Sequence, residues 1–244
     1  MNLSHFGIGE EFRIQNSESS RKRVYCRAGG LNQSAHSADV TEIRLVTRHW
    51  SLETPPMTPD EVLQVFRDSG ALLDGHFILR SGLHSRQFFQ CALALQQMPV
   101  VEKLGHALAA KARALGAVTV IAPALGGLVI GQEVARQLGV RFIFVEKEDG
   151  KLVLRRGFKI ASGEKILVVE DVVTKGGRVQ ETIDIVQAHG GHVAGVATIV
   201  DRSNGTVNFG VPFVALVSQC VETFKPDQLP PDLAKIPAAK PGSK

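Results

Sequence analysis

Apolar residues follow two alternating spacings through most of the chain. Unbroken apolar runs rich in β-branched residues, typical of buried parallel strands, alternate with stretches in which apolar residues recur every three or four positions, as in helices. The expected strands are Val118 to Ala122, Arg141 to Val145, Ile166 to Val169, Val193 to Val200 and Phe213 to Val217. The expected helices are Asp60 to Ser69, Val100 to Leu115, Leu128 to Leu138 and Val179 to Ala188. This order predicts an α/β fold with a central, mostly parallel sheet flanked by helices.

The segment "GHFILRSGLHSRQFFQCAL", residues 75 to 93, departs from this alternation. Two strand-like runs flank the pair Ser81 and Gly82, which favours a turn. We therefore expect a small hairpin ahead of the central sheet.

Residues 1 to 56 are polar and serine-rich and lack a pattern that could build a core. We expect an unstructured extension. A targeting peptide is the alternative, which the acidic residues Glu10, Glu11 and Glu18 weaken.

Met57 stands directly before a strong helix start, where Thr58 can cap the helix and Glu61 can complete a capping box. A mis-assigned start, with Met57 as the true first residue, is therefore a further expectation. One domain is expected over residues 57 to 225, followed by a Pro-rich tail over residues 226 to 244.

Composition and charge narrow the class of protein only slightly. At 244 residues and 44% hydrophobic, the chain is long enough for one full-sized domain. Its net charge of +4 suits a small anionic ligand as well as nucleic acid. The three cysteines, Cys26, Cys91 and Cys220, are far apart and show no zinc-binding spacing, which favours a reduced, cytoplasmic setting.

The uncharged stretch from Ala114 to Gln132 has the length of a membrane span. Pro123 and several glycines interrupt it, so a strand, a tight loop and a buried helix explain it better. We therefore expect no membrane partner.

The stretch "KILVVEDVVTKGGR", Lys165 to Arg178, combines features of a binding loop. Glu170 and Asp171 are expected where a buried strand ends, and open α/β sheets bind ligands at the carboxyl ends of their strands. The glycines that follow would present backbone N–H groups at a helix start, which suits phosphate. The loop matches neither GxxxxGK[ST] nor GxGxxG.

Adjacent carboxylates ahead of a phosphate loop are suited to accept hydrogen bonds from two neighbouring hydroxyls. The stretch therefore predicts a site for a ribose 5-phosphate. The plainer interpretation is that Asp171 caps the turn and that Glu170 is a solvated charge.

The segment "VVEDVVTKGGR" resembles the phosphoribosyl pyrophosphate signature of the type I phosphoribosyltransferases. Together with "GHFILRSGLHSRQFFQCAL", "APALGGLVIGQEVARQLGV", "EKEDGKLVLRRGF" and "VDRSNG", it looks like the orotate phosphoribosyltransferase branch of that family. The resemblance covers Met57 to about Phe224. It implies the type I phosphoribosyltransferase fold, in which the hairpin forms a small hood.

The resemblance implies which residues bind phosphoribosyl pyrophosphate. The acid pair would bind the ribose hydroxyls, and the loop after it the 5-phosphate. The expected set is Lys147, Glu170, Asp171, Val172, Val173, Thr174, Lys175, Gly176, Gly177 and Arg178.

The resemblance also implies an orotate site, formed by Arg80, Phe88, Phe89, Thr174 and Arg202. Orotate is a planar anion, which a guanidinium suits. The alternatives are a surface arginine for Arg80 and an ion pair with Asp201 or another loop acid for Arg202. Phe88 and Phe89 are neighbours that would face opposite sides of a strand, so at least one is expected in the core.

The charged segment "EKEDGKLVLRRGFKI" is expected to be a mobile surface loop. By resemblance it is the catalytic lid, with Lys147 and Lys151 as catalytic residues, and it reaches into the neighbouring subunit of a homodimer. It lacks the histidine of many relatives, and Gly126 replaces a lysine that many relatives carry. Arg155 or Arg156 could therefore help these lysines to bind pyrophosphate.

The implied reaction joins orotate to phosphoribosyl pyrophosphate, with Mg²⁺ as cofactor, in pyrimidine (UMP) biosynthesis. The ion would be held by the diphosphate and the ribose hydroxyls, so no protein metal site is expected. One alternative is a purine phosphoribosyltransferase, against which Arg80 and Arg202 speak. The other is a sensor of phosphoribosyl pyrophosphate that binds nucleic acid through residues 1 to 56, but no helical pattern there supports a nucleic-acid partner.

Overall fold

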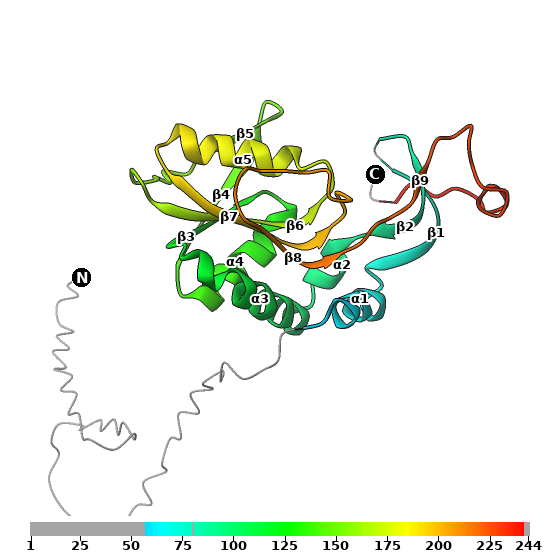
Figure 1. Ribbon diagram of the computed structural model, residues 1–244, viewed down its shortest axis with the longest axis horizontal. Coiled ribbons are helices and arrows are strands. Elements are labelled where there is room, and N and C mark those ends of the chain that lie inside the picture. The colour runs from blue at the N-terminus through cyan, green and yellow to red at the C-terminus, as the bar shows by residue number, and fades with distance from the viewer. Residues whose placement is uncertain (1–56, 80, 242–244) are drawn as a thin grey trace, which may run out of the picture. The chain divides into compact units, whose positions relative to one another are not determined.

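The structure, a computed structural model, describes residues 57–79 and 81–241. The expected extension over residues 1 to 56 and the expected base contact of Arg80 lie outside the described residues. The described part of the chain forms a six-stranded sheet and a smaller three-stranded sheet (Figure 1).

The six-stranded sheet is the centre of the fold, and its strand order is β5-β4-β3-β6-β7-β8. Its strands are β3 (Thr119–Pro123), β4 (Arg141–Glu148), β5 (Lys151–Leu154), β6 (Lys165–Val173), β7 (His192–Asp201) and β8 (Phe213–Ser218). Neighbouring strands are parallel except β4 and β5, which are antiparallel. The expected mostly parallel sheet is therefore confirmed.

Helices cover both faces of this sheet (Figure 1). One face carries α3 (Met98–Ala112), its 3₁₀ extension η1 (Arg113–Leu115) and α4 (Gly126–Leu138), and the other carries α5 (Gly177–Ala188). Leu104 and Ile130 are buried on the first face, and Ile183 and Val186 on the second. The central strands β3 and β6 are buried along most of their length because helices cover both faces of the sheet.

The stretch from Ala114 to Gln132 contains the end of η1, strand β3 and half of α4, as expected. Among residues 57–79 and 81–241, no helix is both long enough and apolar enough to cross a membrane. Burial of β3 between two helical layers accounts for the absence of charge over Thr119–Pro123.

A three-stranded antiparallel sheet, here called the hood, consists of β1 (Leu72–Ile78), β2 (His84–Phe89) and β9 (Thr223–Phe224). Strands β1 and β2 form the expected hairpin, and its turn places Gly82 at a φ of +79°. Helix α1 (Pro59–Asp68) precedes the hood, and Thr58 and Glu61 form the expected capping box. The short helix α2 (Cys91–Leu95) follows it and was not predicted.

Two expectations about strand ends are wrong. Strand β6 does not stop before the acid pair but continues to Val173, because β7 runs beside it as far as Asp201. The charged segment is not an irregular loop, since β4 extends to Glu148 and β5 returns beside it with Leu152 opposite Lys147. The Leu152 side chain is buried in the same core cluster as residues of α5, which accounts for the second strand.

The Pro-rich end of the chain packs on the hood (Figure 1). A 3₁₀ turn, η2 (Leu233–Lys235), places Leu233 in a fully buried position. Further on, Ala239 pairs with Phe77 of β1 through a β-bridge.

Candidate active site

Glu170 and Asp171 lie near the carboxyl end of β6, in the interior of the sheet. Glu170 is only 6% exposed, so its interpretation as a solvated charge is wrong. The backbone N–H groups of Asp171 and Val172 donate to Glu170 Oε1 at 3.1 Å and to Asp171 Oδ1 at 2.8 Å. Burial and the neighbouring charge of Asp171 raise the pKa of Glu170 well above its ordinary value, and burial also raises the pKa of Asp171. Hydroxyl donors from a ligand would therefore stabilise the charged pair.

The first turn of α4 packs against this acid pair because Gly126 and Gly127 have no side chains. A Cβ atom on Gly126 would lie 2.9 Å from Asp171 Oδ1, and one on Gly127 would lie 3.0 Å from Glu170 Oε1. The partial positive charge at a helix N-terminus favours carboxylates at this place. A side chain at position 126 would therefore require Asp171 to move.

The loop between β6 and α5 forms a turn suited to an anion. Gly176 is the N-cap of α5 at a φ of +72°, in the left-handed region that favours glycine. A Cβ atom there would lie 2.9 Å from Val207 Cγ1 and 3.0 Å from the Phe209 ring, so the segment after β7 supports the turn. Thr174 and Lys175 are exposed beside the first N–H groups of α5, which suit a phosphate.

The other residues of the expected loop set differ in burial and in contacts. Val173 is 2% exposed and belongs to the core, whereas Val172 is half-buried. Arg178 donates from Nη1 to the carbonyl oxygen of Ala124 at 3.4 Å, which joins the phosphate turn to the loop after β3.

Arg202 directly follows β7, the strand next to β6. Its guanidinium carbon is 5.4 Å from the centre of the Phe89 ring. Within the described residues its Nε atom is buried without a hydrogen-bond partner, and burial lowers the pKa of Arg202. Asp201, an alternative partner, instead accepts a hydrogen bond from the Ser203 N–H at 2.8 Å. A buried donor of this kind fits a carboxylate ligand.

Phe88 and Phe89 differ in burial, as expected for neighbours on a strand. Phe89 is 6% exposed and meets Phe66 edge to face at 5.7 Å between ring centres. Phe88 is half-buried, and its ring centre lies 5.8 Å from that of Phe77. The prediction that at least one of the pair is core is confirmed.

Cys91, the first residue of α2, is a neighbour of the acid pair that sequence reasoning missed. It is 4% exposed, and burial together with the charges of Asp171 and Glu170 raises the pKa of its thiol well above the ordinary value. The thiol is therefore protonated and can donate toward the carboxylates. Cys91 lies within the segment of residues 75 to 93, but nothing in that segment indicates a contact with the acid pair.

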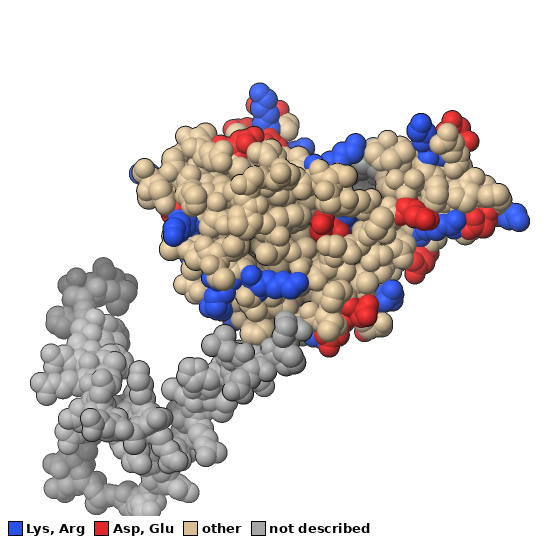
Figure 2. All heavy atoms as spheres, viewed as in Figure 1, with Lys and Arg blue, Asp and Glu red and all other residues tan. Residues whose placement is uncertain are grey.

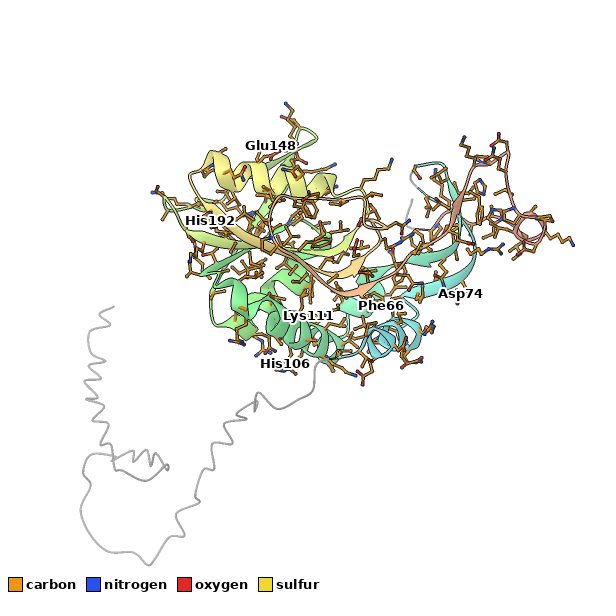
Figure 3. All side chains as sticks on the ribbon, in the orientation of Figure 1. Phe66, Asp74, His106, Lys111, Glu148 and His192 are labelled. Carbon is orange, nitrogen blue, oxygen red and sulfur yellow. The ribbon has the colours of Figure 1, made fainter. Side chains whose placement is uncertain are left out.

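Lys147 and Lys151 are exposed on the β4–β5 hairpin, whose outer part carries Glu148 (Figure 3). Charged side chains gather over this hairpin in the space-filling view (Figure 2). Two arginines that could have joined the lysines are engaged with acids of the same hairpin: Arg155 with Glu148 at 2.8 Å and Arg156 with Glu146 at 2.9 Å. This arrangement favours the lysines over the arginines as pyrophosphate ligands.

Comparison with known proteins identifies the family. Over 188 residues the chain is 50% identical to the orotate phosphoribosyltransferase of Desulforamulus reducens, and this alignment covers 77% of this chain and 98% of that protein. Over 190 residues it is 51% identical to the orotate phosphoribosyltransferase of Heliobacterium modesticaldum, and this alignment covers 77% of this chain and 100% of that protein. This chain belongs to the orotate phosphoribosyltransferase family.

The fold of an orotate phosphoribosyltransferase is supported separately. Residues 93–209, which include the acid pair and the phosphate turn, match the phosphoribosyl transferase domain. The crystal structure of orotate phosphoribosyltransferase from Aeropyrum pernix superposes with a TM-score of 0.56 at 23% identity, covering 64% of this chain and 93% of that one. The expected type I phosphoribosyltransferase fold is therefore confirmed.

Proposed function

We propose that this chain transfers the 5-phosphoribosyl group from phosphoribosyl pyrophosphate to orotate, giving orotidine 5-phosphate and pyrophosphate in pyrimidine biosynthesis. One observation carries the proposal. Glu170, which is buried, and its neighbour Asp171, which is half-buried, lead into an anion-binding turn, and an arginine whose buried Nε has no hydrogen-bond partner among the described residues follows the adjacent strand. Membership of the orotate phosphoribosyltransferases favours the same reaction.

The phosphate side of the site binds and orients the sugar. Glu170 and Asp171 accept hydrogen bonds from the 2- and 3-hydroxyls of the ribose, and the turn from Thr174 to Gly177 binds the 5-phosphate. Binding the sugar at both its hydroxyls and its 5-phosphate fixes its C1 atom relative to the incoming base. This orientation is one contribution to catalysis.

The base side binds orotate and presents its ring nitrogen to C1. Arg202 binds the carboxylate, while Phe88 and Thr174 contact the ring. The bond from the ring nitrogen to C1 forms as the C1–oxygen bond to pyrophosphate breaks, and pyrophosphate leaves with the electron pair. Lys147 and Lys151 stabilise the departing negative charge. The proton of this ring nitrogen is released to solvent, and no side chain is needed as a general base because the nitrogen is acidic for an amide-type group.

Mg²⁺ is the proposed cofactor. Among residues 57–79 and 81–241, no group of three or more His, Cys, Asp or Glu side chains is arranged to hold a metal ion. An ion coordinated mainly by substrate oxygens needs no such group, and Glu170 and Asp171 would hold the ribose hydroxyls that coordinate it. When bound, Mg²⁺ supplies positive charge that offsets the charge of the diphosphate.

A homodimer with shared active sites is part of the proposal. Exposed apolar side chains on the neighbouring helices α2 and α4 favour a protein partner: Leu93 is 38% exposed, Val129 is 38% exposed, and Leu125, just before α4, is 82% exposed. A second copy of this chain would cover them by a self-complementary contact. A cytoplasmic location, expected from the cysteine pattern, belongs to the same proposal.

Pyrophosphate release tests the proposed substrate. The purified chain is mixed with phosphoribosyl pyrophosphate, Mg²⁺ and one base from a panel of orotate, uracil, adenine, guanine and hypoxanthine. We expect release with orotate alone and its loss when the metal is chelated. Release with a purine and none with orotate would identify the purine alternative.

A further inference from the structure

The C-terminal segment Asp232–Ala239, here called the strap, lies along the hood (Figure 1). Most of its residues are exposed, but Leu233 is fully buried. Its far end joins β1 through two backbone hydrogen bonds of 2.8 Å each, from the Ile78 N–H to the Ala239 carbonyl and from the Ala239 N–H to the His76 carbonyl. The strap is therefore a structural part of the hood.

Side chains of both hood strands also hold the strap. Arg86 of β2 forms a two-pronged ion pair with Asp232, which lowers the pKa of that carboxyl to about 2. His76 of β1 is buried, and its Nδ1 donates to the carbonyl oxygen of Ile236 at 2.7 Å, since a carbonyl can only accept. The other ring nitrogen of His76 contacts His84 across the hairpin. The strap thus fixes β1 and β2 at several points.

Strands β1 and β2, which the strap holds, are connected to the base side of the proposed site. Phe77, the bridge partner of the strap, packs its ring against Phe88 at 5.8 Å. Arg86 stands two residues before Phe88 on β2. The next residue, Phe89, lies against the guanidinium of Arg202 at 5.4 Å. The phosphate turn is supported instead by Val207 and Phe209, which lie after β7 and outside the strap.

We propose that the strap is a positioning element for orotate binding. It touches none of the reacting atoms and acts by fixing the hairpin that carries Phe88 and Phe89. Orotate affinity depends on it, whereas affinity for phosphoribosyl pyrophosphate does not. The claim about orotate affinity rests on the proposed function. The claim that the strap fixes the hairpin rests on the hood contacts alone.

The test replaces one backbone donor. Ala239→Pro removes the N–H that donates to His76, and Ala238→Pro is the matched control that leaves this N–H in place. We expect Ala239→Pro to raise the KM for orotate about five- to tenfold, the size of one lost hydrogen bond. The KM for phosphoribosyl pyrophosphate should stay within about twofold, and Ala238→Pro should resemble the parent chain. Amide hydrogen exchange of β1 and β2 should accelerate in Ala239→Pro alone.

Equal rises of both KM values, or an unchanged KM for orotate, would overturn the proposal. If the parent chain does not use orotate at all, the proposed function fails, and the exchange rates of β1 and β2 still decide whether the strap orders the hood. If Ala239→Pro does not fold, Leu233→Ala serves as the second variant, because it empties a buried strap position and keeps the backbone bridge. The same selective rise in the KM for orotate is expected from it, and its absence would contradict the proposal.

Discussion

The phosphate side and the base side of the site are built in different ways. The phosphate side is one continuous stretch, from Glu170 to Arg178, in which a buried strand runs into a turn and a helix. The base side gathers Phe88 and Phe89 from β2 and Arg202 from the end of β7. Its arrangement depends on how the hood packs against the central sheet.

This difference implies that the two substrates respond to different parts of the molecule. Binding of phosphoribosyl pyrophosphate should depend on local backbone geometry, because the groups proposed to hold it are neighbours in the chain. Binding of orotate should depend on distant contacts, including those of the strap. Substitutions that affect one substrate and spare the other therefore test the comparison.

The largest effect is expected from Asp171→Asn, which weakens an acceptor for a ribose hydroxyl. Hydrogen bonds to charged groups contribute about 1.5–3 kcal/mol, so kcat/KM for phosphoribosyl pyrophosphate should fall about 10- to 150-fold. Asp184→Asn, on the exposed side of α5, is the control and should change little. Steady-state kinetics with either substrate varied measure the effect, and a loss confined to orotate would contradict the assignment.

Arg202→Met should produce the complementary result. Loss of the guanidinium should lower kcat/KM for orotate about 10- to 100-fold, while the KM for phosphoribosyl pyrophosphate changes little. Because the buried Nε of Arg202 has no hydrogen-bond partner in the described part of the chain, an apolar side chain there should leave the melting temperature unchanged or raise it. Kinetics together with thermal unfolding separate the two effects, and a lower melting temperature would indicate a structural role instead.

Two neighbouring glycines provide a matched pair on the phosphate side. Gly176→Ala should destabilise the fold by about 1–3 kcal/mol and raise the KM for phosphoribosyl pyrophosphate, because of its φ of +72° and the contacts its Cβ would make. Gly177→Ala has open space around its Cβ and should change stability by less than about 0.5 kcal/mol. Denaturant unfolding of both variants checks this, and equal losses would remove the case for a supported turn.

The smallest effect concerns the pH dependence of stability. Because the pKa of Glu170 is raised in the folded chain, the folded state holds its proton more tightly than the unfolded state does. Stability should therefore fall as pH rises from the ordinary value of 4.5 through the raised one, and Glu170→Gln should remove this contribution. Melting temperatures between pH 5 and pH 8 test the sign, with Glu222→Gln, just before β9, as an exposed control. Parallel curves for Glu170→Gln and the parent would contradict it.

Features with local causes could be predicted from the sequence. The buried strands are continuous apolar runs, such as Ile166 to Val169, and the start of α1 is fixed by Thr58 and Glu61 within one turn. The acid pair and the glycine turn are adjacent, so their joint chemistry could be inferred without knowledge of any distant contact.

Features with distant causes were missed. The second strand of the β4–β5 hairpin forms because Leu152 is buried in the core cluster shared with α5, and its N–H donates to Glu181 Oε1 at 2.6 Å. The contact between His76 and Ile236 joins residues that are 160 positions apart. Cys91 meets the acid pair only because α2 follows the hood. Sequence periodicity and local motifs do not predict contacts between residues that are far apart in the chain.

The central claim is that Glu170 and Asp171 hold the ribose while Arg202 holds the base. A crystal structure with orotidine 5-phosphate bound tests it most directly. We expect the ribose hydroxyls within hydrogen-bonding distance of Glu170 and Asp171, the phosphate on the turn from Thr174 to Gly177, and the base carboxylate at Arg202. A ribose bound away from the acid pair, or a base carboxylate that does not reach Arg202, would contradict the account.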